Sequence, residues 1–322
     1  MASSSDNALT RELLNLALTA GFDDAGVCRA RAYPEMARVR EWIDAGHHAG
    51  MDYMARWADK RMNPQMMVPF AEYALMVVKS YPPAPSHAAE PSPDGEYGTI
   101  SAHAAGADYH NIMKSGLKKL SGVLRQAGYN ARPFVDTAPV AERILAVRAG
   151  LGKVAANTLF YHPRFGSWVF LGGLYTDAPL EAAEVSFQTS DECADCGRCA
   201  QICPAGALSK PGTLDARKCL AYWTIEAKSR IPVQIADKAR GWVFGCDLCQ
   251  LVCPMNQRVH GHGTTTATCH YLLDELSSLG PEGFTSTFAG TTIARLGWER
   301  FLNNVETARN SLHHQRLEVT RK

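Results

Sequence analysis

The stretch CADCGRCAQICP, residues 193–204, places four cysteines within eleven residues and ends in proline. A second stretch, GCDLCQLVCP at residues 245–254, carries three more cysteines and also ends in Cys-Pro. Nine of the ten cysteines in the 322-residue chain lie beyond Asp177. The N-terminus, MASSSDNALTRELL, lacks the basic and then apolar pattern of a signal peptide. Because cytosolic thiols are kept reduced, this cysteine usage predicts metal ligands or redox centres rather than disulfides.

The first stretch has the spacing C-x2-C-x2-C-x3-C-P of bacterial ferredoxins, in which three cysteines ligate one [4Fe–4S] cluster and the fourth reaches another. The two stretches supply seven thiolates and two clusters need eight, so Cys219 in LDARKCLAYW is predicted to supply the last. By analogy with two-cluster ferredoxins, the first set would be Cys193, Cys196, Cys199 and Cys253. The second set would be Cys203, Cys219, Cys246 and Cys249.

The alternative for these cysteines is a pair of zinc sites, since C-x2-C pairs also bind zinc. Three closely spaced cysteines with a terminal Cys-Pro are a poor zinc pattern, which favours clusters. Cys28 and Cys269 are left over, and Cys28 is predicted to be a small buried hydrophobe.

The bulk composition allows a large core and excludes a strong global field. The chain is 46% hydrophobic and carries a formal net charge of +1. A polyanionic partner would therefore have to be bound by a local patch. No apolar run is long enough to cross a bilayer. We expect a soluble, cytoplasmic and monomeric protein with no membrane contact.

Apolar periodicity predicts helices at residues 8–20, 111–127 and 140–149, and strands at residues 22–28, 74–81, 132–135 and 168–175. In the second helix, Ile112, Leu117, Leu120 and Leu124 are expected to face inward. Helices that alternate with strands as far as about residue 180 indicate an α/β domain. A cysteine-rich module follows, and residues 271–305 are predicted to be helical.

Asp136, in VDTAPVAER, follows a short predicted strand and precedes a helix opened by Pro139. Backbone donors and a helix N-terminus would favour the charged form of its carboxyl group. A general acid at this position would need burial or an apolar cofactor to raise its pKa. The alternative is that Asp136 is only an N-terminal cap.

Over most of its length, the chain resembles the epoxyqueuosine reductases. The resemblance is carried by VDTAPVAER, by both cysteine stretches, and by MDYMARWADKRMNP, DYH, AGLG, NTL, GSWVFLGGLYTD, LDARKCLAYWTIEAK and FAGTTIARLGWERFLNN. Many ferredoxin-like proteins share the cysteine stretches. VDTAP followed by GSW-x-FLG and then by eight cysteines is far more specific.

The resemblance implies a cytoplasmic oxidoreductase that reduces the epoxide of epoxyqueuosine in the tRNA anticodon wobble nucleotide to queuosine. Its cofactors would be cobalamin and two [4Fe–4S] clusters, and its electrons would come from an external flavodoxin, ferredoxin or reductase. The implied fold is α+β. A nitroreductase-like α/β cobalamin-binding domain would cover residues 1–180, and a two-cluster ferredoxin-like domain residues 181–262. Residues 263–322 would form a short helical C-terminal segment, a truncated HEAT-like region.

The resemblance also implies roles for particular residues. Asp136 would be the general acid, and Arg143 would face the substrate. The expected cobalamin contacts are Arg61, Asp136, Asn157, Thr158, Phe160, Ser167 and Leu171. The expected tRNA contacts are Lys218, Tyr222, Lys228 and Arg230, because basic residues interleaved with aromatics suit phosphate contact and base stacking. The alternative for the last group is a solvated helix face with its aromatics in the core.

Some positions depart from the family pattern. Ala156 replaces a lysine that usually precedes the Asn-Thr pair, and His103, Ala105 and Ala107 stand where aromatic and basic residues are usual. Cofactor or tRNA contacts could differ there. These departures keep one alternative open, a corrinoid iron–sulfur reductase of the same fold acting on another substrate. A separate alternative is a ferredoxin-like electron carrier. The first 180 residues argue against a pure carrier.

Overall fold

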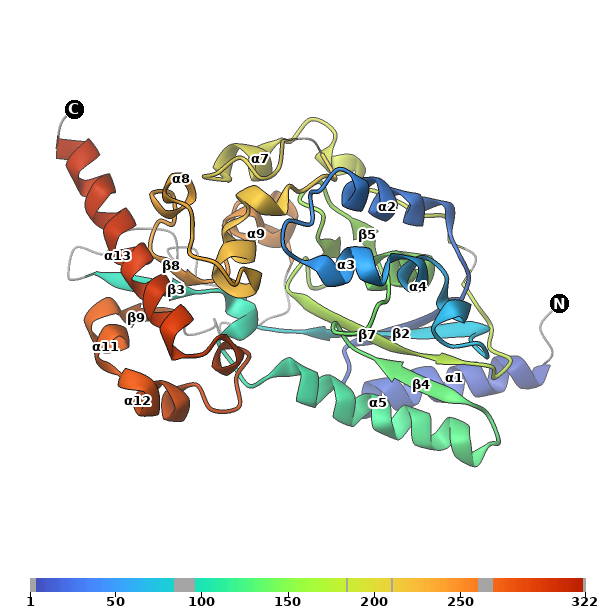
Figure 1. Cartoon of the computed structure of the whole chain (residues 1–322). Coiled ribbons are helices and arrows are strands. Elements are labelled where there is room, and N and C mark those ends of the chain that lie inside the picture. The colour runs from blue at the N-terminus through green and yellow to red at the C-terminus, as the bar shows by residue number, and fades with distance from the viewer. Residues whose placement is uncertain (1–3, 84–95, 184, 210, 260–268, 321–322) are drawn as a thin grey trace.

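The main sheet of the protein is antiparallel throughout. A computed structural model describes residues 4–83, 96–183, 185–209, 211–259 and 269–320 (Figure 1). In it, four strands are ordered β1-β2-β7-β4, and each neighbouring pair is antiparallel. They are β1 (Asp24–Arg29), β2 (Tyr73–Ser80), β4 (Ala131–Phe134) and β7 (Val169–Thr176).

Both faces of this sheet are covered, which explains why β2 is apolar along most of its length. Alternate side chains of a strand point to opposite faces. Leu75 and Val77 pack against α1 (Ser4–Thr19) and α5 (Tyr109–Gln126), which lie along one face of the sheet in Figure 1. Met76 and Val78 pack on the other face, against α6 (Glu142–Arg148).

Helix α6 lies close to the sheet because β1 has a glycine at the contact. A Cβ atom on Gly26 would come within 2.4 Å of the backbone oxygen of Ala149, just past the end of α6. Only glycine permits that approach without a shift of backbone. This contact matters for function because α6 carries Glu142 and Arg143.

In α5, one prediction is wrong. Leu117, Leu120 and Leu124 are fully buried as expected, but Ile112 is 49% exposed. At roughly 100° of rotation per residue, Ile112 points roughly 140° away from Leu117 and so leaves the buried stripe. The helix is amphipathic as predicted, with its apolar face beginning one residue later, at Met113.

A second sheet joins distant parts of the chain. It is ordered β8-β3-β9, with β3 parallel to β8 and antiparallel to β9. Its strands are β3 (Tyr97–Ile100), β8 (Trp242–Phe244) and β9 (His270–Leu272). These strands come from three different predicted domains. The boundaries at residues 180 and 262 stay predictions, and residue 262 lies outside the described residues.

The C-terminal helices cover this second sheet, and residues 271–305 are largely helical as predicted. The helices are α11 (Leu273–Ser278), α12 (Gly280–Thr287) and α13 (Trp298–Thr320). Their core is aromatic, with the Phe301 ring centroid 4.9 Å from that of Phe284 and 5.0 Å from that of Phe288.

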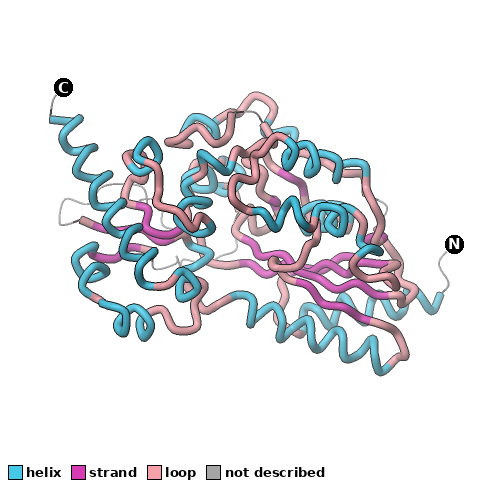
Figure 2. The backbone as a smooth tube through the Cα atoms, viewed as in Figure 1, coloured by secondary structure: helices cyan, strands magenta, loops and turns pink. Residues whose placement is uncertain are grey.

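Short helices joined by long loops make up the rest of the fold (Figure 2). Those of the cysteine-rich module are α7 (Arg198–Ile202), α8 (Val233–Ala236), α9 (Leu248–Leu251) and α10 (Pro254–Gln257). Three more follow β1: α2 (Ala37–Asp44), α3 (Asp52–Arg56) and α4 (Ala58–Met62). A small hairpin pairs β5 (Lys153–Val154) with β6 (Phe160–Tyr161). The predicted mixture of α and β structure is confirmed.

None of the described helices combines the length and the apolar character that crossing a bilayer requires.

The two faces of α5 provide a matched stability test. Leu117→Ala should lower the free energy of unfolding by about 2–5 kcal/mol, because it leaves a cavity in the core. Ile112→Ala on the exposed face should cost less than about 1 kcal/mol. Urea titration followed by circular dichroism measures both. Equal losses would show that Ile112 is buried.

Candidate active site

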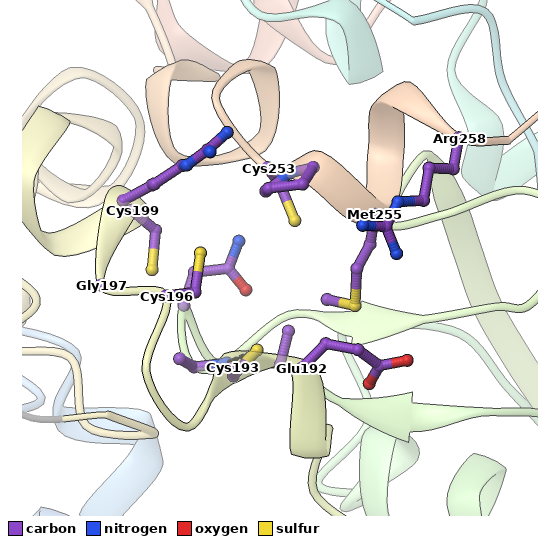
Figure 3. A pocket seen from close by; sticks show the side chains of 13 residues that line it. Glu192, Cys193, Cys196, Gly197, Cys199, Cys253, Met255 and Arg258 are labelled. Atoms are coloured by element: carbon purple, nitrogen blue, oxygen red, sulfur yellow. Dashed lines mark hydrogen bonds between the residues drawn. The ribbon is translucent and has the colours of Figure 1, made fainter.

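Three closely spaced cysteines and one that is distant in sequence surround one small cavity. Cys193, Cys196, Cys199 and Cys253 line a space of about 120 Å³, and their sulfur atoms gather around it in Figure 3. Gly197 has a φ of 60°, in the left-handed region that glycine adopts without steric cost, so the chain can turn between Cys196 and Cys199. The structure thus brings together the predicted first set of ligands.

Three of the four cysteines in the predicted second set line a different and larger cavity. Cys219, Cys246 and Cys249 lie on the wall of a cleft of about 600 Å³, and Cys203 does not. Burial raises the pKa of all three of these thiols. Their thiolates would therefore need a bound cation such as iron to form at neutral pH. In the described part of the chain, no three His, Cys, Asp or Glu side chains are close enough to hold a single metal ion.

The larger cleft also gathers residues predicted from the N-terminal half. Its walls come from the α3–α4 region, the loop after β4, helix α6, the loop before β6 and strand β7. Every predicted cobalamin contact lines it, and so does the predicted substrate contact Arg143: Arg61, Asp136, Arg143, Asn157, Thr158, Phe160, Ser167 and Leu171.

Several polar side chains on the cleft wall are fixed by hydrogen bonds. The Asn157 amide donates to the backbone oxygen of Cys249 at 3.3 Å, which ties the wall to the cysteine-rich module. The Ser167 hydroxyl donates to Gln250 at 2.9 Å. Arg61 donates through Nη1 to the Val140 oxygen at 2.7 Å, but its buried Nε atom has no partner. That atom is a donor available to a bound molecule.

A chain of charged groups leads from the interior to Asp136. The His110 side chain is only 3% exposed, and its Nδ1 atom lies 2.7 Å from Asp108 Oδ1. Its Nε2 atom lies 3.3 Å from Asp136 Oδ2. Arg295, from the C-terminal segment, pairs with Asp108 on the far side. Both imidazole nitrogens thus face carboxylates, and only a doubly protonated ring can donate to both.

The electrostatics of this chain favour a proton on His110. The hydrogen bond to Asp136 raises the pKa of His110 above its usual value, although burial lowers it and Arg295 opposes the charge. Burial raises the pKa of Asp136, but hydrogen bonds from His110 and Tyr109 outweigh it and leave that pKa below its usual range. The side chain of Asp136 lines the cleft, and 58% of its surface is exposed to the solvent there. The raised pKa that a general acid needs is not present with these partners alone.

Glu142 is a second carboxyl group at the same place, which sequence reasoning missed. Its Oε1 atom accepts a hydrogen bond from the backbone N–H of Asp136 at 2.7 Å. Burial, with the charge of Asp136 adding to it, raises the pKa of Glu142 to about 8. The Asp136 backbone has a φ of 46°, an uncommon left-handed conformation that this bond supports. The side chain of Glu142 therefore holds the turn that presents Asp136.

Arg143 contacts the opposite wall of the cleft. Its Nη1 atom donates to the backbone oxygen of Thr158. Thr158 has a φ of 68°, which is costly for a β-branched residue. Arg143 thus supports a strained loop, and its hydrogen bond goes to Thr158 rather than to the neighbouring Glu142.

The predicted tRNA contacts lie outside the cleft. Lys218, Lys228 and Arg230 are exposed, and Tyr222 is half-buried. The Tyr222 hydroxyl accepts a hydrogen bond from the Gly50 N–H at 2.9 Å. None of the four lines the cleft. Their role in RNA contact stays a prediction.

The positions that depart from the family pattern have different surroundings. His103 lines the cleft, and its Nδ1 atom lies 2.8 Å from the Ser101 hydroxyl. Ala105 packs near Trp168, and Ala107 is exposed. Ala156 lines the first cysteine cavity, where its backbone N–H donates to Cys193 Sγ at 3.3 Å. That bond does not need a side chain, so the missing lysine leaves it intact.

Two family models match the chain. Residues 192–256 match the 4Fe-4S double cluster binding domain, and residues 61–137 match "Epoxyqueuosine reductase QueG, DUF1730". The first match decides between clusters and zinc: the cysteine-rich module is a double [4Fe–4S] domain.

Similar proteins cover most of the chain. The epoxyqueuosine reductase of Pseudomonas aeruginosa is 35% identical over 292 residues, which are 88% of this chain and 80% of that protein. That of Escherichia coli K12 is 34% identical, covering 94% of this chain and 81% of its own. That of Cyclobacterium marinum is 34% identical, covering 90% and 93%.

Solved structures of epoxyqueuosine reductases are also similar to this chain. An epoxyqueuosine reductase with a modified tRNA-Tyr stem loop is 26% identical, with a TM-score of 0.83 over 94% of this chain and 81% of that one. The Bacillus subtilis enzyme, with the loop of a catalytic aspartate swung out of the active site, is 26% identical with a TM-score of 0.81, covering 94% and 82%. A catabolic reductive dehalogenase shares the fold alone, at 19% identity and a TM-score of 0.51 over 93% of this chain and 38% of that one. The chain belongs to the epoxyqueuosine reductase family of oxidoreductases.

Proposed function

We propose that this chain reduces the epoxide of epoxyqueuosine in the tRNA anticodon to the alkene of queuosine. One observation carries the proposal: Asp136, which is bonded to a buried histidine, and three cysteines of the double-cluster domain line the same cleft. A proton source and an electron source therefore meet at one place. The relative solved with a modified tRNA stem loop supports RNA as the substrate.

Reduction of an epoxide to an alkene consumes two electrons and two protons and releases the oxygen as water. We infer that the electrons pass through the two predicted cysteine sets in order. The first set lines its own cavity, and three members of the second line the cleft, so an external donor would approach the first. The first cluster would be held by Cys193, Cys196, Cys199 and Cys253. The second would be held by Cys203, Cys219, Cys246 and Cys249.

Two features of the cleft support cobalamin as its occupant. Val140, Val169 and Leu171 give it an apolar wall, and the unpartnered Nε atom of Arg61 offers a donor. We propose that Arg61, Asn157, Thr158, Phe160, Ser167 and Leu171 hold the cofactor. When bound, cobalamin supplies electrons to the epoxide carbon through cobalt. Phe160 would act mainly through packing, because its ring is almost fully buried in the core.

The chain's own residues would deliver the two protons one after the other by the same path, with His110 taking up a solvent proton after the first transfer. His110 holds each proton between Asp108 and Asp136, and passes it to Asp136 Oδ2 across 3.3 Å. Asp136 then donates it to the departing epoxide oxygen. Closure of the cleft by the RNA would exclude water and raise the pKa of Asp136 toward the range that a general acid needs. Arg143, fixed by Thr158, would orient the substrate.

Turnover of modified tRNA tests both the function and the acid. The anaerobically purified protein, given cobalamin and reductant, should convert epoxyqueuosine to queuosine, as read by mass spectrometry of the digested RNA. Asp136→Asn should lower this rate at least about 100-fold, because general acid catalysis is lost. Cobalamin binding, followed by absorbance, should persist in the variant. An active Asp136→Asn protein would rule out this acid.

The pH dependence of the rate tests His110. The pKa of His110 is raised above 6.5 in the folded protein, so its proton is present below that pKa and is lost as the pH rises through it. The turnover rate should therefore fall on the alkaline side. His110→Gln should turn over more slowly and show no such fall, since glutamine does not titrate. The same alkaline fall in both proteins would assign it to another group.

Iron content tests the assignment of Cys219. Cys219→Ala should lose about four irons per chain, because one cluster lacks a ligand. Cys28→Ala is the control, since Cys28 is buried in the core beside Leu145 and should keep all its iron. Iron analysis of both anaerobically purified variants measures the difference. Full iron content in Cys219→Ala would refute its place in the second set.

A further inference from the structure

Two aromatic side chains are exposed, one on α3 and one at the junction between α3 and α4. Tyr53 is 43% exposed and lines the cleft, and Trp57, four residues later, is 41% exposed. Among the large hydrophobic side chains that the described residues leave exposed, these two are the only aromatic ones. Neither Tyr53 nor Trp57 belongs to a hydrophobic core, and the proposed reaction does not require either ring.

Positive charge accompanies the two rings. The Lys60 ammonium lies 4.3 Å from the centroid of the Trp57 ring, and Arg56 is exposed at the end of α3. Two acidic residues, Asp52 and Asp59, lie on the same segment, and Arg40 pairs with Asp59. An exposed indole with a cation over it suits the base and phosphate of an unpaired nucleotide.

This surface continues into the predicted RNA-binding segment. The Gly50 N–H donates to the Tyr222 hydroxyl at 2.9 Å, and the Ala216 N–H donates to the His47 oxygen at 2.9 Å. Tyr53 and Glu226 also lie close enough for each to shift the pKa of the other. The loop before α3 therefore lies directly against residues 216–226, a stretch that contains Lys218 and ends just before Lys228. Residues of α3 and residues of the 216–226 stretch line the same cleft.

We propose that Trp57, with Tyr53 and Lys60, forms a stacking platform for an unpaired base next to the nucleotide that enters the cleft. This inference rests on the proposed RNA substrate and adds the residues that hold the loop around the reacting nucleotide. A protein electron donor fits the surface less well, because no residue of α3 or α4 lines the first cysteine cavity, where a donor would approach. Single-stranded RNA is the partner that exposed rings and cations at a substrate entrance fit best.

Binding of a fluorescein-labelled, unmodified anticodon stem loop to the cluster-loaded protein tests the platform. In fluorescence anisotropy, Trp57→Ala should weaken Kd at least about fivefold, the loss expected for one stacking contact. Trp57→Phe should retain most of the affinity, because phenylalanine still stacks. Met66→Ala is the matched control, since Met66 is an exposed, large, non-aromatic side chain near α4 that does not line the cleft. It should bind like the wild type.

Turnover of the modified stem loop, measured in parallel, separates the two proposals. If the wild type turns over the RNA and Trp57→Ala binds it equally well, the platform is wrong and the proposed function stands. If Trp57→Ala slows cluster reduction by flavodoxin and leaves RNA binding unchanged, the surface belongs to the electron donor and the inference is overturned. If the wild type neither binds nor converts the stem loop, both proposals fail.

Discussion

His110 is held between two carboxylates, and much of the candidate site depends on that arrangement. Asp108 and His110 begin helix α5, and Asp136 follows strand β4. Arg295, which pairs with Asp108, comes from the C-terminal segment. The backbone N–H of Asp108 also donates to the Gly290 oxygen at 2.8 Å. The C-terminal segment therefore fixes the ring that faces Asp136, although none of its described residues lines the cleft.

The same cleft connects proton delivery to the cysteine-rich module. Asn157, beside the first cysteine cavity, also lines the cleft and bonds to the backbone of Cys249. A ferredoxin-like carrier would need neither a cleft of about 600 Å³ nor a carboxyl group bonded to a buried imidazole inside it. The arrangement is explained when electrons and a proton are used together on a bound substrate.

Local patterns in the sequence predicted much of this structure, because they report local constraints. Cysteine spacing indicated which thiols could share a cluster, and apolar periodicity located the strands and helices of the main sheet. The cobalamin candidates, which came from the resemblance, all line one cleft. The prediction that Ile112 is buried was wrong, because a run of apolar residues does not show where the buried stripe of a helix begins.

Contacts between distant residues were not predictable in this way. Arg295 and Asp108 are 187 positions apart, and the pairing of β3 with β8 joins segments that no local pattern relates. Glu142 lies in the VDTAPVAER motif. Its role depends on burial and on the left-handed backbone of Asp136, which only the folded chain provides. The lowered pKa of Asp136, which lies in the loop after β4, likewise arises from His110 and Tyr109 on α5.

The most direct test of the account follows electrons and product in one experiment. The protein, loaded with both clusters and cobalamin, is reduced without oxygen, freed of reductant and mixed with epoxyqueuosine stem loop. Freeze-quench electron paramagnetic resonance then reports the clusters while mass spectrometry reports the RNA. The reduced-cluster signal should disappear in step with the formation of queuosine, with two electrons consumed per alkene formed. Queuosine that appears while the clusters stay reduced, or clusters that reoxidise without queuosine, would contradict it.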